Sequence, residues 1–416
     1  MTLIVQKFGG TSVADAERIK AVAEHVAFTR RQGHDLVVVV SAMGKETDNL
    51  IALASAVSTT LPGREMDMLL TIGERKSMAL VCMALADLGV DAVSFTGSQV
   101  GIITDNVHGR AKILEVKGDR VRAALADGKV CVIAGFQGIS TEREITTLGR
   151  GASDLTAVAL AAAFQANSCE IYTDVTGVFS ADPRLVPQAR KLSHINFDEM
   201  LEIAGAGGRV LALRSVEFAR NHHVALHVRS SFTWEPGTWV TSEEPNMEDP
   251  IISAVVHDVS EAKVTVSAVP DRPGVSAALF EPLAASNINV DMIVQNTSKA
   301  GTTDISFTMP KADMAVAEKV VSDVAAQIGA GGVTHDGDIA KVSLVGAGMK
   351  SSPGIAARMF RVLADEGVNI EMISTSTIRI SVVIAAEGME RALRALHHAF
   401  GLDAGQTYSG PLPERR

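Results

Sequence analysis

The hexapeptide KFGGTS, residues 7–12, follows the short run LIVQ, residues 3–6, almost at the start of the chain. A stretch rich in Ala, Glu and Lys, residues 15–28, predicts a helix directly after it. Glycines let a backbone approach a ligand closely, and the N–H groups at a helix N-terminus attract anions. The hexapeptide therefore fits an anion-binding turn with a lysine at the strand end. It equally fits an ordinary strand-to-helix turn with Thr11 or Ser12 as N-cap.

Apolar, β-branched runs alternate with Ala-rich helical patterns over the first 240 residues. This alternation is typical of a mainly parallel sheet with helices on both faces. Strands buried on both faces are continuous apolar runs, as in LVVVVSAMG (36–44) and KVCVIAGFQG (129–138). Each run ends in small residues at the sheet edge where such folds bind ligands. The expected strands are 3–5, 36–40, 90–95, 130–135, 168–173 and 225–228, and the expected helices are 14–33, 46–58, 64–88, 118–127, 152–166, 196–204 and 210–222.

Length and composition limit the class of protein. A chain of 416 residues exceeds one usual hydrophobic core and predicts two to three domains. Hydrophobic residues make up 47% of the chain and charged residues 21%, which is typical of a globular protein. A net charge of −10 and an aromatic content of 4% argue against nucleic acid binding. The cysteines lack CxxC spacing and are expected to be reduced. The most apolar window, residues 156–166, is too short to span a bilayer. We therefore expect a cytoplasmic protein without a nucleic acid or membrane partner.

An internal repeat begins after residue 241. The segment TSEEPNMEDP (241–250) is polar, acidic and twice interrupted by proline, which indicates a linker. Residues 262–298 then align with residues 340–376, so that Pro273-Gly274 matches Pro353-Gly354 and Asn289 matches Asn369. Each unit reads as strand, Pro-Gly turn, helix, strand, strand and helix. This order predicts two ferredoxin-like βαββαβ domains.

Eight motifs in a fixed order carry a family resemblance over nearly the whole chain. They resemble the bacterial aspartokinases, in which an amino acid kinase domain precedes two ACT domains. The resemblance implies an α/β fold with a mainly parallel sheet sandwiched by helices: a catalytic domain at residues 1–245, a linker at 246–262, and ACT domains at 263–337 and 338–416. The motifs are VQKFGGTSV (5–13), VVSAMG (39–44), LLTIGER (69–75), FTGSQVGIITD (95–105), AGFQG (134–138), TTLGRGASDLTAVALAAA (146–163), YTDVTGVFSADPR (172–184) and SEAKVTV (260–266).

The implied reaction moves the γ-phosphoryl group of ATP to the side-chain carboxylate of L-aspartate, giving 4-phospho-L-aspartate and ADP on the route to lysine, threonine and methionine. A carboxylate is already ionised at neutral pH, so catalysis consists of positioning and charge neutralisation. The resemblance assigns charge stabilisation to Lys7, a phosphate cavity to the N–H groups of Gly9 and Gly10, and orientation of Lys7 to Asp154. Asp154 also fits a helix-dipole role at a helix start. The lysine precedes the glycines, so this is not a Walker loop.

The resemblance also places the substrate. Arg150 would bind a carboxylate, Glu74 the ammonium group, and Ser41 and Thr47 would add hydrogen bonds. Glu74 equally fits a solvated helix pair with Arg75, and Ser41 equally fits a turn residue.

The nucleotide residues follow from the same resemblance, with Mg²⁺ bridging phosphate oxygens and no metal site made by the protein alone. The pairs His222-His223 and His397-His398 do not fit metal ligation, because adjacent helix residues point to different faces. Three departures from the family pattern, Ala152, Thr176 and Arg209, leave open weakened nucleotide binding or a specialised metabolic role. The implied ATP-binding residues are Lys7, Gly9, Gly10, Thr173, Asp174, Phe179, Asp182, Arg184 and Arg209.

The ACT pair implies an amino acid effector, threonine or lysine or both, and a homodimer or larger assembly. An α₂β₂ complex with a short chain started near Met247 is the other expected assembly. Asn289 and Asn369 also fit ordinary turn residues. Two other functions remain open: a catalytically silent amino acid sensor, and another amino acid kinase acting on glutamate or acetylglutamate. The implied effector residues are Asp271, Gly274, Ser276 and Gln295 of the first repeat with Asn369 and Ile370 of the second.

Overall fold

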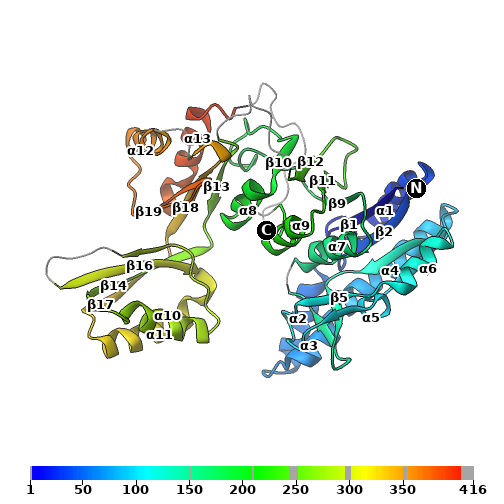
Figure 1. Cartoon of the computed structure of the whole chain (residues 1–416), viewed down its shortest axis with the longest axis horizontal. Coiled ribbons are helices and arrows are strands. Elements are labelled where there is room, and N and C mark those ends of the chain that lie inside the picture. Colours follow the sequence, from blue (N-terminus) through cyan, green and yellow to red (C-terminus); the bar gives the residue numbers. More distant parts are fainter. Residues whose placement is uncertain are drawn as a thin grey trace.

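The N-terminal region is built on an eight-stranded, mainly parallel sheet (Figure 1). The computed structural model describes residues 2–149, 151–208, 210–242, 252–295, 301–349 and 354–403. The strand order is β10-β12-β11-β9-β1-β2-β6-β3, and only β11 and β12 pair in antiparallel fashion. The strands are β1 (Leu3–Phe8), β2 (Asp35–Val40), β3 (Ala92–Phe95), β6 (Val130–Ala134), β9 (Ser168–Thr173), β10 (His194–Asn196), β11 (Leu226–Ser230) and β12 (Thr238–Thr241).

Helices cover both faces of this sheet, as the alternating pattern predicts. On one face α1 (Ala16–Arg31) and α4 (Ile72–Asp87) pack on Val38 and Val40 of β2. On the other face, Val37 and Val39 lie in a cluster with residues of α6 (Asp119–Ala126), α7 (Ala152–Ala163), α8 (Phe197–Gly205) and α9 (Leu213–Asn221). The α/β sandwich expected from the sequence is confirmed.

The expected helix at residues 64–88 is two helices, α3 (Gly63–Leu70) and α4, which meet at Thr71. The carbonyl of Thr71 accepts a hydrogen bond from the Gln137 side chain at 3.3 Å, and its hydroxyl donates to the Met68 carbonyl at 3.0 Å. A tertiary contact at this carbonyl accompanies the break, and helix periodicity does not report such a contact.

A small second sheet, with strand order β5-β4-β7-β8, was not expected. Its strands are too short for an alternating pattern to be recognised. They are β4 (Ile102–Thr104), β5 (Ile113–Val116), β7 (Gln137–Ser140) and β8 (Ile145–Thr147), and the remaining helices of this region are α2 (Glu46–Val57) and α5 (Gly97–Val100).

The first repeat has the expected βαββαβ order and forms a sheet of order β15-β16-β14-β17. Its elements are β14 (Glu261–Pro270), α10 (Val275–Ala285), β15 (Ile293–Gln295), β16 (Thr302–Pro310), the 3-10 helix η1 (Lys311–Asp313), α11 (Met314–Ile328) and β17 (Gly332–Asp336).

The second repeat takes its fourth strand from an unexpected place. Its sheet has the order β13-β18-β20-β19, and β13 (Ala254–Asp258) precedes the first repeat in the sequence. Residues 246–262, expected to be a linker, therefore contain a strand of the second repeat. Strand β13 pairs with β18, and the whole first repeat lies between these two strands in the sequence. A local sequence pattern does not identify such a distant partner. The other elements are β18 (Ile339–Val345), η2 (Ala347–Met349), α12 (Ile355–Asp365), β19 (Met372–Thr375), β20 (Arg379–Ala385), η3 (Ala386–Gly388) and α13 (Met389–Ala399).

The two repeats contact each other within the chain, on one side of the kinase region (Figure 1). Lys341 of β18 is fully buried at this contact and forms ion pairs with Glu261 and Asp291 of the first repeat. A third ion pair joins Lys263 to Glu371. Among the described residues, no helix has the length and apolar character needed to cross a membrane.

Candidate active site

Lys7 and Asp154 form an ion pair at the carboxyl end of β1. The Lys7 Nζ atom lies 2.6 Å from Asp154 Oδ1, and the two side chains are 12% and 10% exposed. Lys7 is carried by a strand that pairs with β2 on one side and β9 on the other, whereas Asp154 lies in the first turn of α7. The structure therefore brings together the two residues expected to be catalytic. Because both side chains are largely buried, salt screens this ion pair much less than an exposed one.

The glycine turn after β1 packs closely on the turn after β2. A β-carbon at Gly10 would lie 3.0 Å from the carbonyl oxygen of Ala42, so a side chain there would displace the turn. The Gly9 N–H donates to the carbonyl of Tyr172 at 3.3 Å. This hydrogen bond differs from the expected use of the Gly9 N–H for phosphate. The N-cap of α1 is Asp15, whose carboxylate accepts the Arg18 N–H, so the alternative with Thr11 or Ser12 as N-cap is wrong.

Glu74 is a buried carboxylate beside the same two turns. It is 3% exposed, and one of its oxygens accepts the Ala42 N–H at 3.2 Å. Its other oxygen, Oε2, is buried without a hydrogen-bond partner among the described residues. Burial raises the pKa of Glu74 to about 7, although the backbone hydrogen bonds favour the ionised form. The alternative of a solvated pair with Arg75 is therefore wrong for Glu74.

Two hydrogen bonds connect α4, which carries Glu74, to the turn after β2 and connect that turn to β1. The Ser77 hydroxyl donates to the Ser41 carbonyl at 2.6 Å, and the Ser41 N–H donates to the Phe8 carbonyl at 3.1 Å. A β-carbon at Gly73 would lie 2.6 Å from the Ala42 side chain, so glycine permits α4 to begin against this turn. Ser41 thus lies between β1 and α4.

Of the other two expected substrate residues, Thr47 and Arg150, the structure describes only Thr47. Thr47 lies half-buried in the first turn of α2. Arg150 lies outside the described residues. Just before it, the Leu148 carbonyl accepts a hydrogen bond from Arg214 at 2.9 Å.

The expected nucleotide residues Thr173 and Asp174 lie at the carboxyl end of β9, next to β1. Two serines that the sequence did not single out connect this end to the glycine turn. The Ser12 hydroxyl donates to Ser231 at 2.8 Å, and the Ser231 N–H donates to the Thr173 carbonyl at 2.9 Å. Both serines are buried. No local sequence signal relates them, because they follow β1 and β11, two strands that lie on either side of β9.

Asp182 and Arg184 form a bidentate ion pair in the segment after β9. The Arg184 Nε atom donates at 2.9 and 3.1 Å to the two carboxylate oxygens. Burial alone would raise the pKa of Asp182, but the hydrogen bonds from Arg184 outweigh it and hold this pKa below its usual value. Phe179 differs from expectation, since its side chain packs in a hydrophobic cluster with the second repeat. Arg209 lies outside the described residues.

Comparison with known proteins agrees with this geometry. Residues 2–230 match the amino acid kinase family, and residues 264–324 and 342–400 match an ACT domain. The chain is 53% identical to an aspartokinase of Mycolicibacterium smegmatis and 52% identical to one of Corynebacterium glutamicum, each over 418 residues and 99% of both chains. The chain belongs to the aspartokinase family. Its structure also matches Escherichia coli aspartokinase III in complex with aspartate and ADP, with a TM-score of 0.81 and 26% identity over 95% of this chain and 99% of the other.

As an aspartokinase, the chain departs from the family motif at Ala152, and the structure explains why alanine fits. Ala152 is the first residue of α7 and does not have a positive φ, whereas the preceding Gly151 has φ 72°. An alanine in helical conformation carries no backbone strain. Thr176, a second departure from the family motif, is a buried residue with 6% of its surface exposed.

The expected effector residues of the first ACT domain lie near the start of α10 and at the end of β15. Ser276 donates from its hydroxyl to the Gln295 side-chain oxygen at 3.2 Å. Asp271, Gly274 and Gln295 are exposed. Asn369 is exposed and Ile370 half-buried on the segment that leads into β19, and β15 contacts β19. The structure thus brings the two edge strands of the repeats together.

Strand β13 contacts both the regulatory and the catalytic parts of the aspartokinase chain. Its Val255 N–H donates to the Ser180 carbonyl at 2.7 Å, two residues before Asp182. The Ser180 hydroxyl is hydrogen bonded at 2.8 Å to His397 of α13, whose other ring nitrogen lies 2.9 Å from Asp403. Glu199 of α8 accepts the Ala347 N–H at 3.2 Å. The segment that carries Asp182 is therefore attached directly to the second ACT domain.

Proposed function

We propose that this chain transfers the γ-phosphoryl group of ATP to the side-chain carboxylate of L-aspartate, giving 4-phospho-L-aspartate and ADP. The observation that carries the proposal is the placement of the buried Lys7–Asp154 ion pair and the buried Glu74 carboxylate around adjacent turns. One group is suited to a phosphoryl anion and the other to an ammonium group. This step begins the route to lysine, threonine and methionine.

The reaction needs positioning more than proton transfer. An oxygen of the ionised substrate carboxylate forms a bond to the γ-phosphorus, the bond from phosphorus to the bridging oxygen breaks, and its electron pair leaves with ADP. Lys7 neutralises negative charge on the transferring group, and Asp154 holds the Lys7 ammonium in place at 2.6 Å. No general base is required because the nucleophile is already an anion.

Glu74 supplies the counter-charge for the substrate amine. Its buried Oε2 atom has no hydrogen-bond partner among the described residues, and an ammonium group would provide one. The ion pair would also compensate the cost of ionising a buried carboxylate. Arg150, by family resemblance, would bind the α-carboxylate of the same substrate.

ATP would lie over the carboxyl ends of β1 and β9, against Thr173, Asp174, Asp182, Arg184 and Arg209. The carboxylates of this segment offer the oxygen ligands that Mg²⁺ prefers, and Arg184 keeps Asp182 ionised. Bound Mg²⁺ would neutralise phosphate charge. The three cysteines are free thiols, which supports a reducing compartment such as the cytoplasm.

The proposal is tested by trapping the acyl phosphate product with hydroxylamine. Purified protein with MgATP is expected to form a hydroxamate from L-aspartate and to give only background signal with glutamate or acetylglutamate. A product from glutamate or acetylglutamate alone would favour another amino acid kinase. Absence of product from all three would favour a silent sensor, although Lys7, Glu74 and Asp154 are all in place.

The ACT pair would make this activity sensitive to threonine, lysine or both. A structure of E. coli aspartokinase III with lysine and aspartate, described as the T-state, matches this chain with a TM-score of 0.75 and 26% identity. An effector acts only through its different affinity for two arrangements, typically by about 1–3 kcal/mol. The contacts of β13 with Ser180 support a route from the ACT domains to the ATP segment. The working assembly would be a homo-oligomer or an α₂β₂ complex with a short chain started near Met247.

Changing Gln295 or Asn369 to alanine is expected to raise the half-inhibitory effector concentration about fivefold or more. Uninhibited activity should remain nearly unchanged, because neither residue belongs to the turns and helices that carry Lys7, Asp154 and Glu74. Asn289→Ala, at the equivalent position of the first repeat, is the matched control. The effector role is wrong if millimolar threonine and lysine, alone or together, alter neither the activity nor the melting temperature of the unmodified chain.

A further inference from the structure

The chain from Val178 to Leu192 forms a loop that begins and ends in the kinase core but packs on the second ACT domain. Val178 and Leu192 belong to the hydrophobic cluster on the kinase sheet. The apolar side chains between them lie instead in one cluster with residues of β18, α12 and α13. Those side chains are Phe179, Ala181, Val186 and Ala189. We call residues 178–192 the nucleotide loop, because it carries Asp182 and Arg184.

Hydrogen bonds attach the nucleotide loop to two elements of the second ACT domain. The Val255 N–H of β13 donates to the Ser180 carbonyl at 2.7 Å. The Arg394 side chain of α13 donates from Nε to the Leu185 carbonyl at 2.8 Å. The conformation of the loop therefore depends on a domain other than the one in which its two ends are anchored.

His397 of α13 lies where the two arms of the loop meet. Its side chain is fully buried, with Nε2 at 2.8 Å from the Ser180 hydroxyl and Nδ1 at 2.9 Å from Asp403 Oδ1. The same Ser180 hydroxyl oxygen accepts the Arg190 N–H, from the other arm, at 3.0 Å. A single histidine thus connects the second ACT domain to both arms of the loop.

The protons of this cluster can be assigned from its hydrogen bonds. The hydrogen bonds from His398 and His397 hold the pKa of Asp403 below its usual value, so the carboxylate is an acceptor and Nδ1 of His397 carries the proton. Burial lowers the pKa of His397, which keeps the ring neutral and leaves Nε2 to accept the Ser180 hydroxyl. The order Ser180–His397–Asp403 is that of a hydrolytic triad, but Ser180 is 0% exposed and cannot reach a substrate. The cluster therefore holds the loop.

We propose that His397 is a positioning residue for the nucleotide loop, so that the second ACT domain supports ATP binding even when no effector is present. The proposal rests on the proposed function, which assigns ATP to Asp182 and Arg184. The loop follows β9, whose carboxyl end lies next to that of β1, which carries Lys7. Open α/β sheets bind ligands at this edge. The groups around Glu74 are attached elsewhere, through Ala42, so the effect should fall on ATP and spare aspartate.

Two substitutions of His397 separate its two hydrogen bonds. The amide nitrogen of His397→Asn takes the place of Nδ1, so this variant keeps the contact with Asp403 and loses Ser180. The longer side chain of His397→Gln reaches the place of Nε2, where its oxygen can accept the Ser180 hydroxyl. In steady-state kinetics of the full chain without effector, we expect His397→Asn to raise the KM for ATP at least about tenfold. We expect His397→Gln to stay within about threefold, and both variants to change the aspartate KM less than about twofold.

Limited proteolysis measures the loop itself, without turnover or nucleotide. Trypsin cleavage after Arg184 and Arg190 is expected to be at least about fivefold faster in His397→Asn than in the unmodified chain. Mass spectrometry of the fragments identifies the cleaved bonds.

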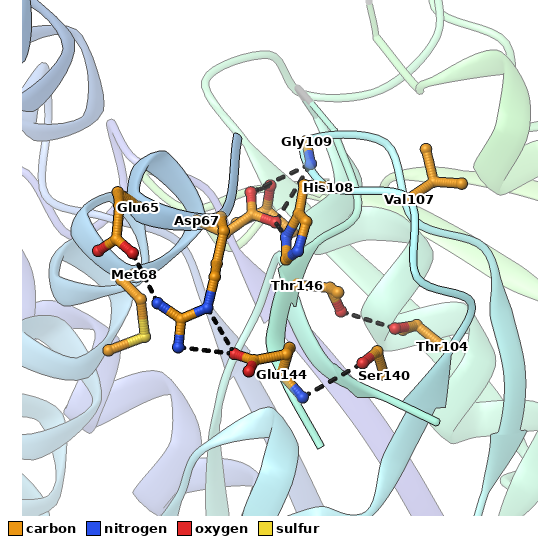
Figure 2. A network of polar contacts seen from close by, with 12 residues as sticks. Glu65, Asp67, Met68, Thr104, Val107, His108, Gly109, Ser140, Glu144 and Thr146 are labelled. Atoms are coloured by element: carbon orange, nitrogen blue, oxygen red, sulfur yellow. Dashed lines mark hydrogen bonds and ion pairs between the residues drawn. The ribbon is translucent and has the colours of Figure 1, made fainter. Parts of the chain in front are cut away.

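Two other histidines that contact an aspartate provide matched controls. His398 follows His397 on α13, is 84% exposed and pairs only with Asp403 among the described residues, so His398→Ala should match the unmodified chain. His108 lies 2.7 Å from Asp67 in the kinase region (Figure 2). His108→Asn removes part of a histidine–aspartate pair outside the loop and should leave the ATP KM within about twofold.

The outcomes distinguish positioning from a merely structural role. A lower melting temperature in His397→Asn with an unchanged ATP KM would overturn the proposal, as would equal increases for ATP and aspartate or equal ATP KM values in His397→Asn and His397→Gln. If His397→Asn does not fold, Ser180→Ala decides, and an unchanged ATP KM in that variant would overturn the proposal. If the unmodified chain forms no hydroxamate, the proposed function fails, while a smaller thermal stabilisation by MgADP in His397→Asn would still support the positioning role. Absence of that stabilisation in the unmodified chain would overturn both.

Discussion

Replacing Lys7 by alanine is expected to abolish hydroxamate formation from aspartate, with a loss of at least about a thousandfold in kcat. The Lys7 ammonium is the cation held at the end of β1, and the transferring phosphoryl group needs that charge most in the transition state. The kcat of Lys7→Arg is also expected to be low, because a planar guanidinium does not occupy the place of a compact ammonium. Coupled detection of ADP provides an independent measure of the same loss.

Lys20→Ala is the control for this prediction. Lys20 is 66% exposed and pairs only with Glu17 on the surface of α1 among the described residues, so its removal should leave the activity unchanged. Lys7→Ala leaves Asp154 as a buried carboxylate without its cation, which destabilises the fold, so thermal unfolding must be measured beside activity. A folded Lys7→Ala protein with normal kcat would refute the assignment of Lys7.

Glu74→Gln is expected to raise the KM for aspartate about a hundredfold while the KM for ATP stays within about twofold. A neutral amide cannot compensate a buried ammonium group, so the loss corresponds to one charged hydrogen bond in a dry site. Glu65→Gln, at an exposed position of α3, is the matched control and should behave like the unmodified chain.

The same carboxyl group makes aspartate binding dependent on pH. With a pKa of about 7 in the free enzyme, Glu74 is ionised to about nine tenths at pH 8 and about one tenth at pH 6. The aspartate KM should therefore rise as the pH falls from 8 to 6, and Glu74→Gln should lose this dependence. A flat aspartate KM across this range in the unmodified chain would contradict the assignment.

Glu74 also affects stability, with the opposite direction in pH. The folded state holds this proton more tightly than the unfolded state, whose carboxyl has a pKa near 4.5. The contribution to the free energy of unfolding is thus fully present below about pH 4.5 and is lost as the pH rises toward 7. The melting temperature of Glu74→Gln should improve relative to the unmodified chain over this interval, as measured by thermal unfolding at several pH values.

The sequence by itself determined the layers of the kinase domain and the presence of the repeats. Residues 37–40 are continuously apolar because β2 is buried on both faces, and the helices alternate with such strands at regular intervals. The Pro-Gly pairs recur in equivalent places of the two repeats, and their glycines, Gly274 and Gly354, are the N-caps of α10 and α12. These features are local, since hydrophobic period and turn chemistry depend on neighbouring residues. The motifs that carry Lys7 and Asp154 were likewise recognisable in the sequence, but the distance between the two side chains was not.

Tertiary structure alone decided which residues meet and how deeply they are buried. Glu74 reads as a surface residue of a helix, yet the approach of α4 to the turn at Ala42 removes it from water and raises its pKa. Strand β13 follows an acidic segment of the sequence, yet it pairs with β18, which comes after the whole first ACT domain in the sequence. Asp67 and Thr147 are 80 residues apart and share one hydrogen bond. Burial, partner and pKa are properties of contacts between distant segments, and a local pattern records only the periodicity of each segment.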